Sequence, residues 1–128
     1  DIQGIAYYGS YIDFIDVAQA EYFRNLGILT HQANDRKVFD LAAVKVTLEY
    51  KSPAKIDELI DIFLRVEKIG RTSIDKRSEI YRSDTDELLC SVQSISVNFD
   101  SELGKSRVVP TEIKDIIQQF ESTGHINK

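Results

Sequence analysis

The hydrophobic period of this sequence changes from helical to strand-like after its first third, and that change restricts the folds open to the chain. Between residues 10 and 26 the apolar side chains recur every three or four positions, as they do on one face of an α-helix. This stripe consists of Tyr11, Phe14, Ile15, Ala18, Tyr22 and Leu26. Ser10 is expected to cap the start of the helix, with Asp13 completing a weaker form of the capping box, and Gly27 is expected to end it. We therefore predict one long amphipathic helix.

From residue 44 onward the apolar side chains alternate with polar ones, which is the period of a half-buried β-strand. We predict strands over residues 44–51, 60–67, 72–82 and 88–99, and a short fifth strand over 107–109. Gly70 marks a hairpin turn between the second and third strands. In the fourth strand the apolar phase jumps between Val92 and Ile95, which predicts a β-bulge.

The chain closes with a second helical pattern, "TEIKDIIQQF", which Pro110 and Thr111 begin. The order of elements predicts a single α+β domain over residues 1–128, in which the long helix covers the apolar face of an antiparallel sheet. A sheet that curls around the helix would give a hotdog fold. Cystatin-like folds also lay a helix across an antiparallel sheet, and periodicity alone does not separate the two.

Composition and charge exclude several classes of protein. The chain has 128 residues and a formal net charge of −5, which argues against non-specific binding to nucleic acid. Because no apolar run could span a bilayer and no secretory signal is visible, we expect a cytoplasmic protein. Cys90 is the only cysteine, so no internal disulfide can form. His31 and His125 have no partners at metal-ligand spacing, and we expect neither a metal nor a cofactor.

The start of the chain carries a more specific motif. The pattern D-x-x-G-I-A-Y-Y-x-x-Y leads into "FIDVAQAEYFRNLG". This stretch resembles the acyl-CoA thioesterases of the 4-hydroxybenzoyl-CoA thioesterase type, and it is similar to the related Tol-Pal-associated thioesterases. The matching positions are Asp1, Gly4, Ile5, Tyr7, Tyr11, Ala18, Glu21, Arg24, Leu26 and Gly27. Farther on, "LEYKSPAKIDELIDIFLRVEKIGRTS" resembles the family's tyrosine-to-proline turn and its strand ending in glycine, a basic residue and serine.

The resemblance implies a hotdog fold, with a long central helix wrapped by a curved antiparallel sheet and a short C-terminal helix. In the family a strand precedes the aspartate, so we expect a first strand upstream of Asp1. Two positions depart from the family pattern. Gln19 stands where the family usually has arginine, which removes an ion pair that would anchor the helix. Tyr8 stands where many members have histidine, which removes an imidazole from the loop.

The resemblance also implies the chemistry: metal-independent hydrolysis of an acyl-CoA thioester to a free acid and coenzyme A. Asp1 matches the family's catalytic carboxylate and would act as a nucleophile or as a general base on water. The backbone N–H of Tyr8, just before the helix, would bind the developing oxyanion. Gly4 would let the loop backbone approach the thioester without a Cβ. The structural alternatives are an Asx-turn role for Asp1 and an ordinary turn glycine at Gly4.

The residues around the start of the helix also include candidates for the acyl pocket and an alternative catalytic acid. Tyr7, Tyr8 and Tyr11 would line the acyl pocket, although a role in the core is favoured for Tyr11. Other hotdog branches draw their carboxylate from the long helix, which makes Asp16 an alternative catalyst. The default interpretation of Asp16 is an acid at the surface or at an interface.

Coenzyme A brings a pyrophosphate and a 3′-phosphate, so an acidic protein needs a local basic edge to bind it. The segment "RVEKIGRTSIDKR" offers five basic residues, namely Arg65, Lys68, Arg71, Lys76 and Arg77. Within this segment Arg71, Thr72 and Ser73 match residues that touch the nucleotide in the family. The alternative is a solvated turn with ordinary surface charge.

The resemblance implies a homo-oligomer, either a dimer or a tetramer. In the family two hotdogs pair edge to edge into one continuous sheet, and each pocket uses residues of both chains. Two other functions stay open. The protein could bind acyl-CoA or an acyl carrier without hydrolysis, or it could be a hydratase or dehydratase, although the latter usually needs an Asp-His pair and no histidine lies near the loop.

Overall fold

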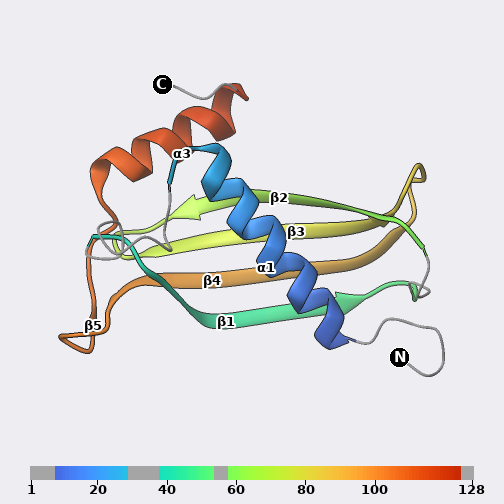
Figure 1. Cartoon of the computed structure of the whole chain (residues 1–128), viewed down its shortest axis with the longest axis horizontal. Helices are drawn as coiled ribbons and strands as arrows, with labels where there is room; N and C mark the ends of the chain where they lie inside the picture. Colours follow the sequence, from blue (N-terminus) through green and yellow to red (C-terminus); the bar gives the residue numbers. More distant parts are fainter. Residues whose placement is uncertain (1–7, 29–37, 54–57, 125–128) are drawn as a thin grey trace.

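The computed structural model describes residues 8–28, 38–53 and 58–124. Along the chain its elements are α1 (Tyr8–Asn25), β1 (Leu41–Tyr50), β2 (Ile60–Ile69), β3 (Ser73–Arg82), β4 (Leu88–Asp100), β5 (Lys105–Ser106) and α3 (Thr111–Thr123). The long strands form an antiparallel sheet in the order β1-β4-β3-β2, and β5 pairs with β4. Figure 1 shows α1 lying obliquely across one face of this sheet, with α3 near the C-terminal end of α1. The predicted α+β class is confirmed.

Helix α1 starts earlier than predicted and ends where predicted. Ser10 lies within its first turn, so the prediction that Ser10 caps the helix is wrong, because the backbone is already helical two residues before it. At the other end Gly27 has a φ of 81°. The N–H of Gly27 donates to the carbonyl of Arg24 at 3.0 Å, and that of Ile28 donates to the carbonyl of Phe23 at 2.8 Å. These two bonds form a Schellman motif, which ends the helix and returns Ile28 to the core.

The register shifts of the sheet lie elsewhere than predicted. The β3–β4 ladder runs without interruption from Val92 to Ile95, so the β-bulge predicted between these residues is wrong. The ladders instead shift at Val44 in β1, at Glu67 in β2 and at Leu89 in β4, where one strand contributes an extra residue.

The apolar phase of β4 jumps for a different reason, because the buried side of the strand becomes polar. Val92, Ser96 and Asn98 alternate on the buried side and are at most 2% exposed, whereas Ile95 and Val97 on the outer side are half-buried. Burial of Ser96 and Asn98 is tolerated because both side chains have hydrogen-bond partners.

The C-terminal elements depart slightly from the prediction. The predicted strand over residues 107–109 is wrong, since β5 consists of Lys105 and Ser106, which pair with Asp100 and Phe99. Beyond β5 the backbone leaves the ladder and crosses toward the β2–β3 turn, where the N–H of Val109 donates to a carbonyl of that turn. Helix α3 is confirmed, and it continues three residues past the predicted Phe120.

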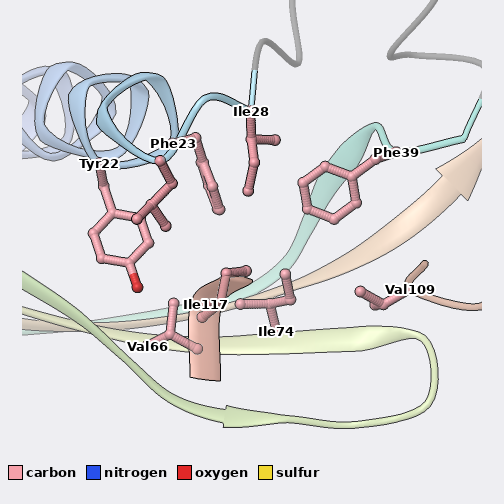
Figure 2. Packing of buried hydrophobic residues seen from close by; sticks show 9 residues of the cluster. Tyr22, Phe23, Ile28, Phe39, Val66, Ile74, Val109 and Ile117 are labelled. Carbon is pink, nitrogen blue, oxygen red and sulfur yellow. The ribbon is translucent and has the colours of Figure 1, made fainter. Parts of the chain in front are cut away.

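Two hydrophobic clusters fill the space between α1 and the sheet. The α3 cluster lies under the C-terminal half of α1 and is completed by α3 (Figure 2); its buried members are Tyr22, Phe23, Leu26, Ile28, Phe39, Val66, Ile74, Val109 and Ile117. The Tyr11 cluster lies under the N-terminal half; its buried members are Tyr11, Ile15, Ile80, Leu89, Cys90 and Val92. Each cluster packs a different half of the helix against the sheet.

Lys76 lies on β3 between the two clusters and is 1% exposed. Its Nζ donates to Oε1 of Gln19 on α1 at 2.6 Å and to Oγ of Ser96 on β4 at 3.0 Å. Burial lowers the pKa of this amine to about 8, while the charge of Asp16 opposes that shift. The interpretation of Lys76 as part of a basic edge is therefore wrong. The residue instead ties α1 to the sheet at Gln19, the position where the family's arginine is missing.

Candidate functional site

The start of α1 is the first part of the candidate site. The first N–H groups of an α-helix have no acceptor within the helix, and they lie at the positive end of its dipole. The first turn of α1 contains no acidic residue that would occupy this end. The backbone N–H of Tyr8, which was predicted just before the helix, belongs to this turn because α1 starts two residues earlier than predicted. Asp1, Gly4 and Tyr7 lie outside the described residues, so their predicted roles stay predictions.

Aromatic side chains surround the start of α1. Tyr11 is fully buried, as expected for the core role favoured from the sequence. Its ring meets Phe14 edge-to-face at a centroid distance of 6.1 Å and Tyr50 of β1 at 5.4 Å. Tyr50 is 48% exposed. Tyr11 therefore packs beneath Phe14 and Tyr50, which form an aromatic surface that an acyl group could contact.

Strand β1 borders this surface and has an open side. It pairs with β4, and no other described strand pairs with it. The sequence placed Val44, Val46, Leu48 and Tyr50 on the face covered by the helix. This is wrong for most of the strand, because Val44, Val46 and Tyr50 are 60%, 47% and 48% exposed and only Leu48 packs on the Tyr11 cluster. The helix crosses the sheet obliquely, so part of the apolar face of β1 stays uncovered (Figure 1).

The second part of the candidate site is the turn between β2 and β3. A Cβ at Gly70 would lie 2.6 Å from Oγ of Ser73, so a larger residue there would require the serine side chain to rotate. The N–H of Gly70 donates to the carbonyl of Ser73 at 2.8 Å and closes the turn. Arg71 is exposed, while Thr72 and Ser73 are half-buried. A solvent-facing guanidinium on a fixed turn is suited to binding a phosphate.

The two parts lie at opposite ends of the sheet (Figure 1). The start of α1 packs near Ile80, whereas the turn precedes Ser73 at the other end of β3. At 3.3 Å per residue, these positions of β3 are about 23 Å apart. A single chain therefore does not bring Arg71, Thr72 and Ser73 to the helix start.

The other acids and the cysteine that could take part in catalysis are not placed in a site. Asp13 and Asp16 are exposed on α1. Cys90 is buried, and burial raises the pKa of its thiol to about 11, so it is a weak nucleophile at neutral pH. Within residues 8–28, 38–53 and 58–124, no group of three His, Cys, Asp or Glu side chains could hold a metal ion. The same residues contain no helix long and apolar enough to cross a membrane.

An open groove of about 890 Å³ lies on the face of the sheet opposite α1. Phe63 and Tyr81 form its aromatic part, with their rings 5.7 Å apart. The polar lining consists of Asp61, Arg65, Glu79, Asp84, Thr85 and Asp86. Of the predicted basic edge, Arg65 lies here, and none of the residues predicted to touch substrate does. The excess of carboxylates in this groove makes it unsuited to the phosphates of coenzyme A.

Sequence reasoning missed the buried polar residues that hold the site in place, above all Lys76 and Asn98. Lys76 could have been found from its spacing, because it alternates with Ile74 and Ile80 on the buried side of β3. Asn98 carries a weaker signal, since asparagine is depleted in strands and marks a position where side-chain hydrogen bonds replace packing.

Comparison with known proteins decides between the two helix-on-sheet folds. A model of the thioesterase superfamily matches residues 3–89. The chain belongs to this family. Among solved structures, Slr0204, a 1,4-dihydroxy-2-naphthoyl-CoA thioesterase from Synechocystis, has a TM-score of 0.84 at 16% identity and covers 94% of this chain and 88% of its own. The resemblance to hotdog thioesterases is confirmed, and the cystatin-like alternative is excluded.

Two further relatives extend the comparison. The acyl-CoA thioester hydrolase YbgC of Escherichia coli O6:H1 is 26% identical over 121 residues, which are 94% of this thioesterase and 87% of YbgC. A thioesterase from Thermus thermophilus, complexed with coenzyme A and Zn, has a TM-score of 0.79 at 16% identity and covers 95% of this chain and 85% of its own. The predicted class of enzyme, a thioester hydrolase, is confirmed.

Proposed function

We propose that this thioesterase hydrolyses acyl-CoA thioesters at the start of α1, in a site shared by two subunits. The observation that carries the proposal is the helix start, where the first turn of α1 holds no acidic residue and lies beside a half-exposed aromatic surface. The similarity to YbgC, named an acyl-CoA thioester hydrolase, supports coenzyme A as the leaving group. With one buried cysteine and no disulfide, the enzyme suits the cytoplasm.

In the proposed reaction the carboxylate of Asp1 attacks the thioester carbon or takes a proton from an attacking water. Negative charge then develops on the carbonyl oxygen. The N–H of Tyr8 donates to this oxygen at the positive end of the helix dipole. Collapse of the intermediate breaks the C–S bond, and the coenzyme A thiolate leaves and takes up a proton, which protonated Asp1 supplies on the general-base route. On the nucleophilic route water then hydrolyses the anhydride between Asp1 and the acyl group, which releases the acid and frees Asp1. Gly4 keeps the loop free of a Cβ at this point. No step requires a metal, because the amide donors supply the electrostatic stabilisation.

The acyl group lies on the aromatic surface next to the helix start. Tyr7 lines this pocket, and Tyr11 supports it through its contacts with Phe14 and Tyr50. Tyr50 combines contact with the Tyr11 ring and a surface that is 48% exposed, so it is suited to contact the acyl chain.

A dimer through the open edge of β1 explains how the two parts of the site combine. A two-fold axis at this edge would place the β2–β3 turn of one subunit at the same end of the continuous sheet as the α1 start of its partner. Arg71, Thr72 and Ser73 of one subunit would then bind the phosphates of the substrate cleaved by the other. The pairing would also cover Val46 and part of Tyr50, which are half-exposed in the single chain.

The decisive experiment compares Asp1→Asn with the wild type, following free thiol release from aromatic, short-chain and long-chain acyl-CoAs. We expect a loss of about 10²–10⁴ in kcat. Asp13→Asn, an exposed acid on α1, is the control and should retain full activity. Unchanged cleavage by Asp1→Asn would reject the catalytic carboxylate. Wild-type protein that binds acyl-CoA but releases no thiol would favour the non-catalytic alternative.

A further inference from the structure

Asn98 of β4 is a fully buried polar residue at the turn end of the sheet, with 0% exposure. Its Nδ2 donates to the carbonyls of Val38 at 2.8 Å and Val108 at 3.0 Å. Its Oδ1 accepts from the N–H of Asp40 at 2.9 Å and from Nε of Arg107 at 3.0 Å. The side chain thus uses both amide hydrogens and both lone pairs of its oxygen. Four hydrogen bonds from one buried amide join β4 to the segments before β1 and after β5.

The backbone of Asn98 extends this network to the β2–β3 turn. Its N–H donates to the carbonyl of Thr72 at 2.8 Å, and its carbonyl accepts from the N–H of Arg107 at 2.8 Å. The N–H of Val109 donates to the carbonyl of Arg71 at 2.9 Å. Two consecutive carbonyls of the turn are therefore held from outside the hairpin.

Both of these bonds involve residue 98, one through its backbone and the other through its side chain. The bond to Thr72 comes from its own N–H. The bond to Arg71 comes from the segment 107–109, which the Asn98 amide holds at the carbonyl of Val108. Without these contacts the turn would be held by the Gly70–Ser73 bond and by the ladder pairs beside it, Ile69 with Ile74 and Ser73 with Val97. A buried amide with no spare hydrogen-bond capacity is a rigid support, because shifting it breaks several bonds together.

We propose that Asn98 is a positioning residue, which keeps the β2–β3 turn in the conformation that binds the phosphates of coenzyme A. This inference rests on the proposed function, in which Arg71 and its neighbours bind those phosphates. Asn98 lies at the turn end of the sheet, about 23 Å along the strands from the start of α1. Its loss should therefore weaken binding of the nucleotide and leave bond cleavage intact.

The test is Asn98→Asp, which keeps the side-chain shape and replaces the donors to Val38 and Val108 with a carboxylate oxygen. Each variant is assayed on an acyl-CoA and on the N-acetylcysteamine thioester of the same acid, which lacks the nucleotide. We expect KM for the acyl-CoA to rise about tenfold, with kcat within about twofold of wild type. On the truncated substrate kcat/KM should be unchanged. Gln93→Glu is the matched amide-to-acid control on the outer face of β4, and it should leave kcat and KM unchanged on both substrates.

The outcomes separate this inference from the proposed function. Arg71→Gln reports on the phosphate contact itself. If Arg71→Gln raises KM for the acyl-CoA and Asn98→Asp does not, the inference is overturned. A loss of kcat by Asn98→Asp on both substrates also overturns it, since that pattern indicates general damage. If wild type releases thiol from neither substrate, the proposed function fails instead. Should Asn98→Asp fail to fold, Asn98→Ser, which leaves room for water, takes its place under the same criteria.

Discussion

The two hydrophobic clusters beneath α1 differ in how the chain closes them. In the α3 cluster Ile117 of α3 is fully buried, and Phe39 and Val109 close the remaining sides. The Tyr11 cluster has no such cover among the described residues, and at its border Tyr50 and Val46 stay about half exposed. The first cluster is completed by the chain itself and serves stability. Among the described residues the second keeps a half-exposed border, and in the proposed function this border meets the substrate and the second subunit.

The largest expected effect contrasts one residue from each cluster. Ile117→Ala removes buried methyl groups from the α3 cluster and should lower the free energy of unfolding by about 2–5 kcal/mol. Tyr50→Ala removes a half-exposed ring and should cost about 1 kcal/mol or less in stability, while lowering kcat/KM for acyl-CoA. Urea unfolding at matched protein concentration, together with thiol release, measures both. If the two variants lose equal stability, the clusters do not differ as described.

The next-largest effect concerns Lys76, which lies between the two clusters and should make the free energy of unfolding depend on pH. The pKa of Lys76 is lowered from 10.5 to about 8 in the folded chain. Below pH 8 the amine is charged in both states, and the full cost of burying that charge is present. As pH rises from about 8 to about 10.5, the folded state binds fewer protons than the unfolded state, so stability rises.

Lys76→Met removes this dependence. The variant should be more stable than wild type at pH 7, by an amount on the order of 2–3 kcal/mol, and this difference should shrink as pH approaches 10.5. Lys68→Met on the exposed side of β2 is the control and should show no such trend. Chemical denaturation at several pH values measures the stability difference between each variant and the wild type. A stability difference that is constant with pH would contradict the buried charge.

Much of the fold could be predicted because it is encoded locally. The change of hydrophobic period located α1 and the long strands, and Gly27 located the end of α1. The failures at the buried polar positions share one physical cause, which is that their partners are distant in sequence. Ser96 is tolerated on the buried side of β4 because Lys76 reaches it, and Lys76 is tolerated because Gln19, 57 residues away, accepts its hydrogen bond. No local pattern contains that information.

The candidate site was predictable in parts but not as a whole. The resemblance singled out the N–H of Tyr8 and the turn at Arg71, yet the sequence could not place them at opposite ends of the sheet. That distance follows from strand register and from the oblique crossing of α1. The exposure of Val46 was likewise unpredictable, because alternation on an edge strand does not say whether the cover comes from the same chain or from another.

The open edge of β1 can be tested directly. Val46→Lys places a charge on the half-exposed face of this edge, and it should raise the dissociation constant of the dimer about tenfold or more. Val108→Lys, at a position with 51% exposure away from this edge, is the matched control and should leave assembly unchanged. Sedimentation over a range of concentrations measures the effect. If assembly survives Val46→Lys and is lost in Val108→Lys, the subunits meet elsewhere.

The smallest expected effect concerns how α1 is joined to the α3 cluster. At Gly27 an added Cβ would meet nothing within 4 Å, so Gly27→Ala introduces no clash and its cost comes only from the φ of 81°. We expect a loss of about 1 kcal/mol. Gly124 has a similar φ of 74° and equally open surroundings, but it lies beyond the last turn of α3. Gly124→Ala should cost less, because that turn can fray without disturbing the core, whereas Gly27 must return Ile28 to the cluster. Thermal unfolding compares them, and an equal loss would show that the closed cluster does not depend on the path of the chain after α1.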